Sequence, residues 1–215
     1  ILKKKPKKIF VIEKDENLVK NLSLKFGNKI NIINKDILKF FDKSIFTNET
    51  IVVGNLPYNI SSQILVKFIL NEVNFKFKAL LFMFQKEMAN RILAKVNSKE
   101  YGRISILANW KFDIKKILDV KPNSFSPSPK VDSSLLIFKK NKKAYDLKNP
   151  KSLENITRVF FNQRRKKIKK PINQIFGSSH KIIKKLNLNL DLRPQNLDIK
   201  TFCELASEYD DQLLD

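Results

Sequence analysis

Residues 50–58 read Thr-Ile-Val-Val-Gly-Asn-Leu-Pro-Tyr and join a short apolar run to a proline turn. The run is β-branched, which is typical of a strand buried in a parallel sheet. After Asn59, apolar residues recur at helical spacing as far as Ile69. In open α/β sheets, ligands bind at the carboxyl ends of such strands, so we expect the proline turn to lie beside a binding crevice.

The same alternation of strand and helix patterns extends over most of the chain. Predicted strands cover residues 9–12, 30–33, 50–53, 79–84, 114–120 and 131–138, and helical patterns cover 18–26, 60–69, 86–94 and 103–110. This order predicts an α/β domain with a mainly parallel sheet over residues 1–148. Beyond Asn149 only helical patterns remain, so residues 149–215 are predicted to form a small all-helical domain.

Composition narrows the class of protein. The chain has 215 residues, of which 42% are hydrophobic, and this is enough to bury a real core. No apolar run is long enough to span a bilayer and no signal-peptide pattern opens the chain, so we expect a cytoplasmic protein that does not bind membranes. The single Cys203 cannot form an internal disulfide, and with the single His180 it makes a zinc site or a Ser-His-Asp triad a poor prediction. We therefore expect no metal.

The net charge is +22, from 43 basic and 21 acidic residues, and it predicts a polyanionic partner, nucleic acid before a membrane surface. An AT-rich genome would also raise the lysine content, so the distribution of charge must decide. No acidic residue occurs from Asn155 to Leu190, where ten basic residues lie: Arg158, Arg164, Arg165, Lys166, Lys167, Lys169, Lys170, Lys181, Lys184 and Lys185. We predict that this stretch binds RNA phosphates, with Arg164 and Arg165 as candidates for bidentate contacts; a solvated helical face is the alternative.

Polar residues follow three successive predicted strands: Glu13, Asp36 and Asn55. A carboxylate at such a position can accept hydrogen bonds from the two hydroxyls of a ribose, and an acid one strand along can accept from an adenine amino group. Helix caps and loop acids also occur at strand ends and are the alternative for either acid taken alone. Three polar strand ends in succession favour a crevice lined with acceptors.

The proline turn has the chemistry to hold the amino group of a base. The exocyclic nitrogen of adenine is a poor nucleophile because its lone pair is delocalised into the ring, and two acceptors aimed at its N–H bonds favour the tetrahedral shape that it needs. The Asn55 side-chain oxygen and the Leu56 carbonyl can be those acceptors, and Pro57 fixes the direction of the carbonyl. Tyr58 offers a ring on which a flipped base can stack. An ordinary turn is the alternative.

Five segments, in order along the chain, resemble motifs of one protein family. Residues 55–61, Asn-Leu-Pro-Tyr-Asn-Ile-Ser, resemble the catalytic motif of the KsgA-type ribosomal RNA adenine N6,N6-dimethyltransferases. Similar to further motifs of that family are Gln85-Lys86-Glu87 with Arg91, Tyr101-Gly102-Arg103-Ile104-Ser105, residues 125–133 (Phe-Ser-Pro-Ser-Pro-Lys-Val-Asp-Ser) and residues 161–167 (Phe-Asn-Gln-Arg-Arg-Lys-Lys). The matches run from about Phe10 to Phe202.

The resemblance implies a class I, Rossmann-like methyltransferase fold with S-adenosylmethionine as methyl donor. It places Glu13 at the ribose of the donor, Asp36 at its adenine, and Asn55 between donor and target, with Ile37 as a further donor-binding residue. It also places Phe125 near the target base. The implied substrate is a pair of adjacent adenosines in the hairpin near the 3′ end of small-subunit rRNA, met in a nearly assembled subunit by a monomeric enzyme of ribosome biogenesis.

One part of the family pattern is missing, namely the Gly-rich donor loop after the first strand. The chain has four glycines and none falls in a G-x-G, so we expect the first strand and this loop to lie upstream of Ile1. Two alternatives remain. One is a large-subunit rRNA adenine methyltransferase of the antibiotic-resistance type, and the other is a non-catalytic RNA-binding assembly factor on the same scaffold.

Overall fold

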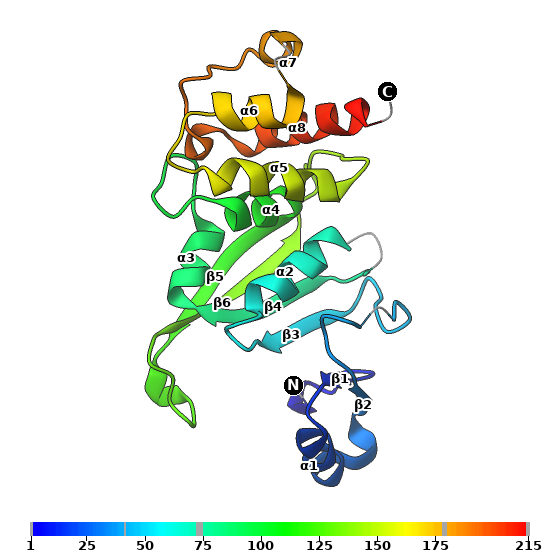
Figure 1. Cartoon of the computed structure of the whole chain (residues 1–215). Coiled ribbons are helices and arrows are strands. Elements are labelled where there is room, and N and C mark those ends of the chain that lie inside the picture. The colour runs from blue at the N-terminus through cyan, green and yellow to red at the C-terminus, as the bar shows by residue number, and fades with distance from the viewer. Residues whose placement is uncertain (1, 41, 72–74, 178–179, 214–215) are drawn as a thin grey trace.

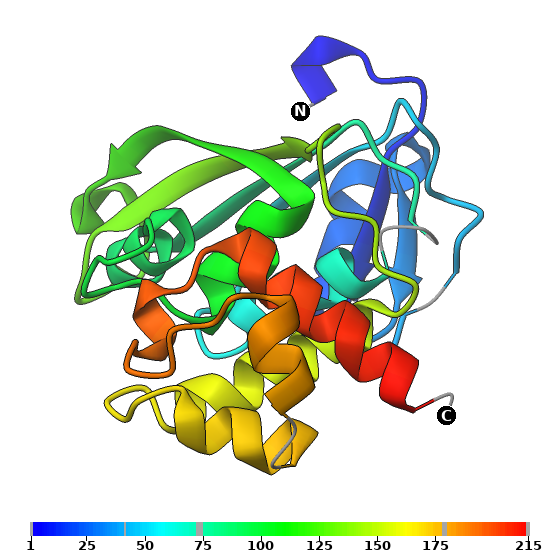
Figure 2. The same cartoon turned by 90° about the horizontal axis from the view of Figure 1, so that it is seen from above.

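The computed structural model describes residues 2–40, 42–71, 75–177 and 180–213. The outer ends of the two predicted domains, at Ile1 and at residues 214–215, lie outside the described residues. Figure 1 shows three parts along the long axis: a small β-α-β unit, a four-stranded sheet with helices, and a group of helices at the far end. Figure 2 shows this last group from above.

The β-α-β unit opens the chain. Strands β1 (Phe10–Glu13) and β2 (Asn31–Asn34) pair in parallel as a separate two-stranded sheet. Helix α1 (Glu16–Phe26) connects them and is followed by the short 3-10 turn η2 (Gly27–Lys29), while another such turn, η1 (Leu2–Lys4), precedes β1. The carboxylate of Asp15 accepts hydrogen bonds from the first turn of α1 and thereby caps the helix.

The larger sheet has the strand order β3-β4-β6-β5. Its members are β3 (Ile51–Asn55), β4 (Ala79–Gln85), β5 (Phe112–Val120) and β6 (Ser133–Lys140). β3 and β4 are parallel, and β6 is antiparallel to both of its neighbours, so β3, β4 and β5 point the same way. The predicted α/β class with a mainly parallel sheet is therefore confirmed, with β6 as the one reversed strand.

Phenylalanines fill the core between this sheet and its helices α2 (Ser61–Leu70), α3 (Lys86–Leu93) and α4 (Arg103–Lys111). The ring of Phe68 on α2 lies 5.6 Å from Phe82 on β4, which lies 6.1 Å from Phe138 on β6. A Cβ atom added to Gly54 would meet the Leu56 side chain at 2.5 Å and Phe82 at 3.1 Å. A side chain at this position would therefore have to displace the Leu56 side chain where the strand passes into the proline turn.

The opposite face of the sheet is more open. Ile51 and Val53 on β3 are 57% and 50% exposed, whereas the ring of Phe82 on the covered face is buried. Because side chains alternate along a strand, Asn55 shares the open face with Ile51 and Val53. The sheet thus turns one face to the core and the other to solvent.

The C-terminal helices are α5 (Pro150–Asn162), α6 (Lys169–Phe176), α7 (His180–Lys185) and α8 (Ile199–Gln212), with a short turn η4 (Pro194–Asn196) before α8. They begin at the predicted boundary, where the Asn149 side chain caps α5. Arg103 on α4 donates to Glu154 on α5 at 2.7 Å, and the Tyr101 hydroxyl donates to the Leu197 carbonyl at 3.1 Å. One hydrophobic cluster spans the sheet domain and these helices, so the division into two domains remains a prediction from the sequence.

Candidate active site

The backbone of the proline turn is held by its own hydrogen bonds. β3 ends at Asn55, and the Ile60 N–H then donates to the Pro57 carbonyl at 3.1 Å. The Ser61 hydroxyl donates to the Tyr58 carbonyl at 3.0 Å, where α2 begins. The strand, turn and helix expected from the sequence are all present, and the turn has a fixed shape.

Two acceptors in the turn remain available for a ligand. The Asn55 side chain is exposed, and none of the described residues hydrogen-bonds to its side-chain amide or to the Leu56 carbonyl. Pro57 follows directly and has no N–H that could compete for them. An amide oxygen and a carbonyl that need no internal bond to be broken can accept both N–H bonds of an amine.

Tyr58 is held differently. Its hydroxyl lies 2.7 Å from the hydroxyl of Ser133, the fully buried first residue of β6. The ring is half-buried, and this contact fixes its direction. Ser133 belongs to a motif found in the sequence, but its bond to Tyr58 joins positions far apart in the chain and could not be predicted from spacing.

The two predicted donor-binding acids lie at one edge of the β1–β2 sheet. Glu13 pairs with Asn34, and Asp36 follows two residues later. One Glu13 oxygen accepts from the N–H groups of Lys14 and Asp15, at 2.7 and 2.9 Å. These hydrogen bonds leave its second oxygen for a ligand.

Asp36 is held in an ionised form. Its carboxylate accepts from the Leu38 N–H at 2.9 Å and lies 3.5 Å from the Lys14 ammonium. The Leu38 N–H is the main cause that lowers the pKa of Asp36, and the charge of Lys14 adds to it. Ile37, the next predicted contact, is half-buried in the same turn. An ionised acceptor beside an apolar side chain fits an adenine ring with an amino group.

Phe125 lies half-buried in the connection from β5 to β6, after the short turn η3 (Pro122–Ser124). The connection leads into β6 at Ser133, which contacts Tyr58. Lys86 fixes the end of this connection next to β6. Its backbone N–H donates to the Asp132 carbonyl at 2.9 Å, and its ammonium lies 3.4 Å from the Asp132 carboxylate. This gives the Gln-Lys-Glu motif a structural role next to the candidate site.

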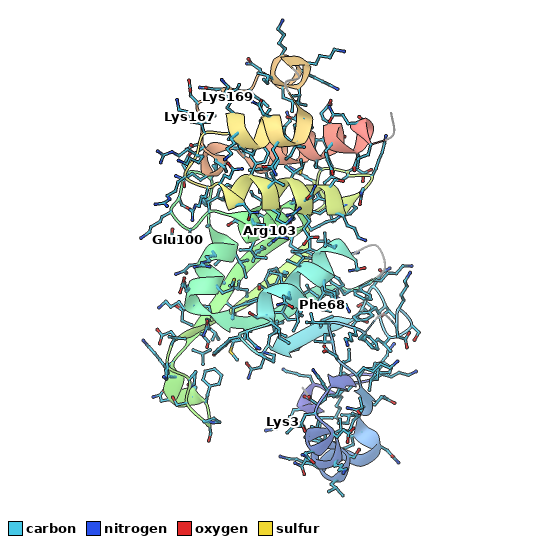
Figure 3. All side chains as sticks on the ribbon, in the orientation of Figure 1. Lys3, Phe68, Glu100, Arg103, Lys167 and Lys169 are labelled. Carbon is cyan, nitrogen blue, oxygen red and sulfur yellow. The ribbon has the colours of Figure 1, made fainter. Side chains whose placement is uncertain are left out.

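The predicted RNA-binding residues gather around the end of α5 and the start of α6. Arg158 is exposed on α5, Lys169 and Lys170 lie in the first turn of α6, and the loop between these helices carries the others: Arg164, Arg165, Lys166 and Lys167. Figure 3 shows Lys167 and Lys169 pointing away from the helices. Lys167 is not bare, because its ammonium lies 2.7 Å from Asp191. We call this set, Arg158 to Lys170, the basic surface.

Arg164 differs from its neighbours because it is half-buried and donates to the Lys99 carbonyl. A cavity of about 470 Å³ opens beside it, lined by Asn97, Lys99, Arg164, Arg165, Arg193 and Gln195. No acidic side chain lines this cavity. Sequence reasoning missed Lys99 and Arg193, since they lie outside the acid-free stretch and join it only in the folded chain.

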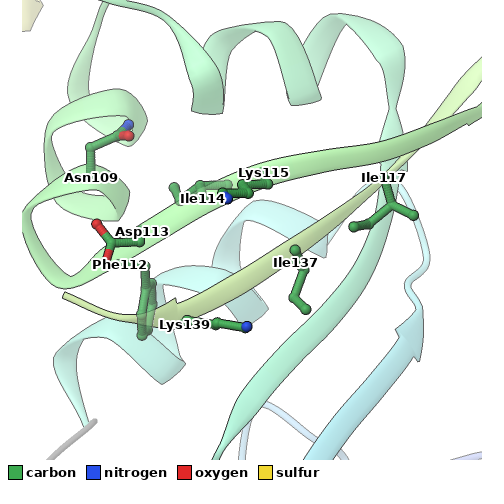
Figure 4. A pocket seen from close by; sticks show the side chains of 8 residues that line it. All are labelled: Asn109, Phe112, Asp113, Ile114, Lys115, Ile117, Ile137 and Lys139. Carbon is green, nitrogen blue, oxygen red and sulfur yellow. The ribbon is translucent and has the colours of Figure 1, made fainter.

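A second cavity, of about 680 Å³, lies on β5 and β6 and is drawn in Figure 4. Ile114, Ile117 and Ile137 line it together with Asp113, Lys115 and Lys139. It contains none of the predicted site residues. Among the described residues, no group of three or more His, Cys, Asp or Glu side chains is placed to hold a metal ion. In the same part of the chain, no helix is both long and apolar enough to cross a membrane.

The fold is that of a class I methyltransferase. A solved dimethyladenosine transferase from Plasmodium falciparum matches with a TM-score of 0.77 and 25% identity, over 96% of this chain and 83% of that one. The 23S rRNA methyltransferase ErmE matches with a TM-score of 0.62 at 18% identity, over 97% and 84% of the two chains, and this likeness concerns the fold alone.

The chain belongs to the ribosomal RNA adenine dimethylase family, whose model matches residues 1–211. A relative, the ribosomal RNA small subunit methyltransferase A of Pelagibacter ubique (strain HTCC1062), is 53% identical over 212 residues. That match covers 98% of this chain and 81% of the relative. The family predicted from the five motifs is thereby confirmed, and membership implies an rRNA methyltransferase with S-adenosylmethionine as co-substrate.

Proposed function

We propose that this enzyme dimethylates N6 of two adjacent adenosines in the hairpin near the 3′ end of small-subunit rRNA. The observation that carries the proposal is the 53% identity to a relative named as a small subunit methyltransferase. The ErmE likeness, at 18% identity, gives no reason to prefer a large-subunit target. The substrate particle is a late assembly intermediate of the small subunit, met by a monomeric enzyme in the cytoplasm.

The proposed mechanism rests on the proline turn. The Asn55 oxygen and the Leu56 carbonyl accept the two N–H bonds of the target amine and favour its tetrahedral form. Pro57 holds the carbonyl in place, and Tyr58, fixed by Ser133, supports the flipped base. S-adenosylmethionine supplies an activated methyl group, so no metal is needed.

The remaining predicted residues bind the two substrates. The second oxygen of Glu13 accepts from the donor ribose, and Asp36 accepts from its adenine amino group beside Ile37. Phe125 contacts the target base from the β5–β6 connection. The basic surface follows the phosphates of folded RNA, which makes the affinity depend on salt. The acid-free cavity beside Arg164 supports this assignment.

The test compares Asn55→Ala with the wild type on undermethylated small subunits and, in a separate arm, on large subunits. We expect methyl transfer by the wild type to small subunits only, and a loss of about 100-fold or more in Asn55→Ala with RNA affinity retained. Asn48→Ala, an exposed residue of the loop before β3, is the matched control and should act like the wild type.

Each contrary result has its own meaning. Methylation of large subunits instead would favour the antibiotic-resistance type of target. Tight RNA binding without methyl transfer to either particle would favour the assembly factor. Full activity of Asn55→Ala would refute the mechanism while leaving the substrate assignment intact.

A further inference from the structure

A buried lysine holds the turn that carries Asp36. Lys67, on α2, is only 8% exposed. Its ammonium donates to the backbone carbonyls of Ile37 and Leu38, both at 2.8 Å, and of Phe40 at 2.5 Å. An ammonium has three N–H bonds and no acceptor, so it can donate to all three of these carbonyls.

Such an arrangement is costly unless the contacts are specific. Burial lowers the pKa of Lys67, because the charged form loses its hydration, while the nearby charge of Asp36 opposes this shift. Lysine is seldom buried without partners that compensate for the lost water. The three carbonyls supply that compensation, and their positions are fixed in return.

The turn is fixed from three sides. Asp36 accepts from the Leu38 N–H at one end, and Phe40 is buried at the other, with its ring centre 6.4 Å from that of Phe46. Lys67 holds the middle. The turn follows β2, which belongs to a different sheet from β3. Lys67 therefore ties a loop of the small β-α-β unit to α2, the helix that begins directly after the proline turn.

We propose that Lys67 is a positioning residue for the donor: its ammonium holds the segment from Asp36 to Phe40 in place against α2, so that the donor adenine meets a preformed binding site. This inference rests on the proposed function, in which Asp36 and Ile37 contact the donor adenine. Lys67 itself touches backbone carbonyls and acts through them.

The test uses Lys67→Met, which keeps length and apolar volume but removes all three donors. The dissociation constant for S-adenosylhomocysteine is measured by calorimetry, with amide hydrogen exchange of residues 36–40 in the ligand-free protein. We expect this constant to rise about tenfold or more, with faster exchange of that turn, because three carbonyls, one of them in a buried hydrogen bond, lose this donor. The Michaelis constant for the donor should rise in parallel, while kcat at saturating donor changes less than about twofold.

Two further variants make the result specific. Lys67→Arg keeps the charge but presents its N–H groups as a planar fork, so it should weaken the binding of S-adenosylhomocysteine by only about threefold. This variant replaces Lys67→Met in the test if the methionine variant does not fold. Lys20→Met removes an exposed lysine of α1 and should change nothing. RNA affinity should be the same in all of these proteins.

The outcomes separate the inference from the proposed function. A wild type that binds S-adenosylhomocysteine, with folded Lys67 variants that bind it equally well, overturns the inference alone. Equal binding despite faster exchange of residues 36–40 also overturns it, since the turn would then be ordered for stability only. A wild type that does not bind S-adenosylhomocysteine contradicts the donor site itself, and the inference fails with it.

Discussion

Asn55 and Tyr58 belong to the same turn and are held in opposite ways. Asn55 is an exposed side chain whose oxygen is left for a ligand, whereas the Tyr58 hydroxyl is bonded to Ser133. The Asn55 oxygen is therefore unconstrained by internal hydrogen bonds, whereas the direction of the Tyr58 ring is set by Ser133. In the proposed mechanism, the amide can adjust to a reacting amine and the ring is oriented before a base arrives.

The Tyr58–Ser133 bond predicts a non-additive pair of variants. Tyr58→Phe and Ser133→Ala each remove one partner, and we expect each to slow methyl transfer about fivefold, as for one hydrogen bond of ~1 kcal/mol. The double variant should be no slower than either single variant, because the same bond is removed in all three. Single-turnover methylation at saturating donor and RNA measures all three.

A neighbouring serine provides the control for this cycle. Ser134 is equally buried, but its hydroxyl donates to Asp119 at 2.6 Å. Ser134→Ala should therefore combine additively with Tyr58→Phe. Strictly additive losses for Tyr58→Phe with Ser133→Ala would contradict the assigned bond.

Cys203 predicts a dependence of stability on alkaline pH. Burial raises the pKa of its thiol to about 12, with a further contribution from the charge of Glu204. As the pH rises, the folded state keeps the thiol proton to a higher pH than the unfolded state does. The thiol therefore contributes fully to folding stability below about pH 9. This contribution is lost between about pH 9 and 12, by up to ~1.4 kcal/mol per pH unit. Urea unfolding of wild type and Cys203→Ala across that range checks it. Curves that stay parallel would contradict the prediction.

At the scale of elements, the strands and helices follow from local sequence, but their order in the sheet does not. The β-branched run before Gly54 and the apolar stripe after Asn59 give β3 and α2 at the expected places. Nothing local places β6 between β4 and β5, since that order depends on pairing between strands far apart in sequence. Periodicity reports which face of an element is buried, and it carries no information on which element covers that face.

The cap of α1 gives a prediction at this scale. The Asp15 carboxylate satisfies two N–H groups that have no partner within the helix, at 2.8 and 3.0 Å. We expect Asp15→Ala to lower the free energy of unfolding by about 1 kcal/mol and Asp15→Asn by only a few tenths, because asparagine is an equally good cap. Hydrogen exchange of the α1 amides and urea unfolding measure both variants. Equal losses would mean that the negative charge, and not the cap, is what matters.

At the scale of the whole molecule, the basic surface and the β-α-β unit lie at opposite ends (Figure 1). The acid-free stretch of sequence locates most of that surface, while Lys99 and Arg193 join it only through folding. Similarly, the strand-end rule finds Glu13, Asp36 and Asn55, but not the contacts of Lys67 with the carbonyls of Ile37, Leu38 and Phe40 in the turn that follows Asp36. Sequence patterns thus find candidate ligand-binding groups, and they miss contacts that depend on the folded chain.

Charge reversal can distinguish RNA binding by the basic surface from an effect of the total charge of the protein. The double variant Arg165→Glu with Lys166→Glu changes two exposed residues of the basic surface. We expect it to bind RNA more weakly. The slope of log affinity against log salt concentration should also become smaller, by about 0.7 to 1 for each phosphate that is no longer neutralised. Arg164 is a poorer choice because it also bonds to Lys99. Lys20→Glu with Lys29→Glu, at the far end, gives the same net charge and should bind RNA nearly as the wild type does. Equal losses of affinity in both pairs would reduce the effect to net charge.

The central position of β6 affects how the chain emerges from a ribosome. β4 and β5 are synthesised first, and each must wait for β6 before it gains its shared neighbour. Until residue 140 has left the exit tunnel, the edge of β4 that will pair with β6 stays unpaired. β6, the last strand to be made, then inserts between β4 and β5. Nascent chains stalled before β6 should therefore be cleaved readily by protease, whereas chains extended past it should resist. The order of synthesis thus makes β6 the strand whose arrival closes the sheet and protects the two strands made before it.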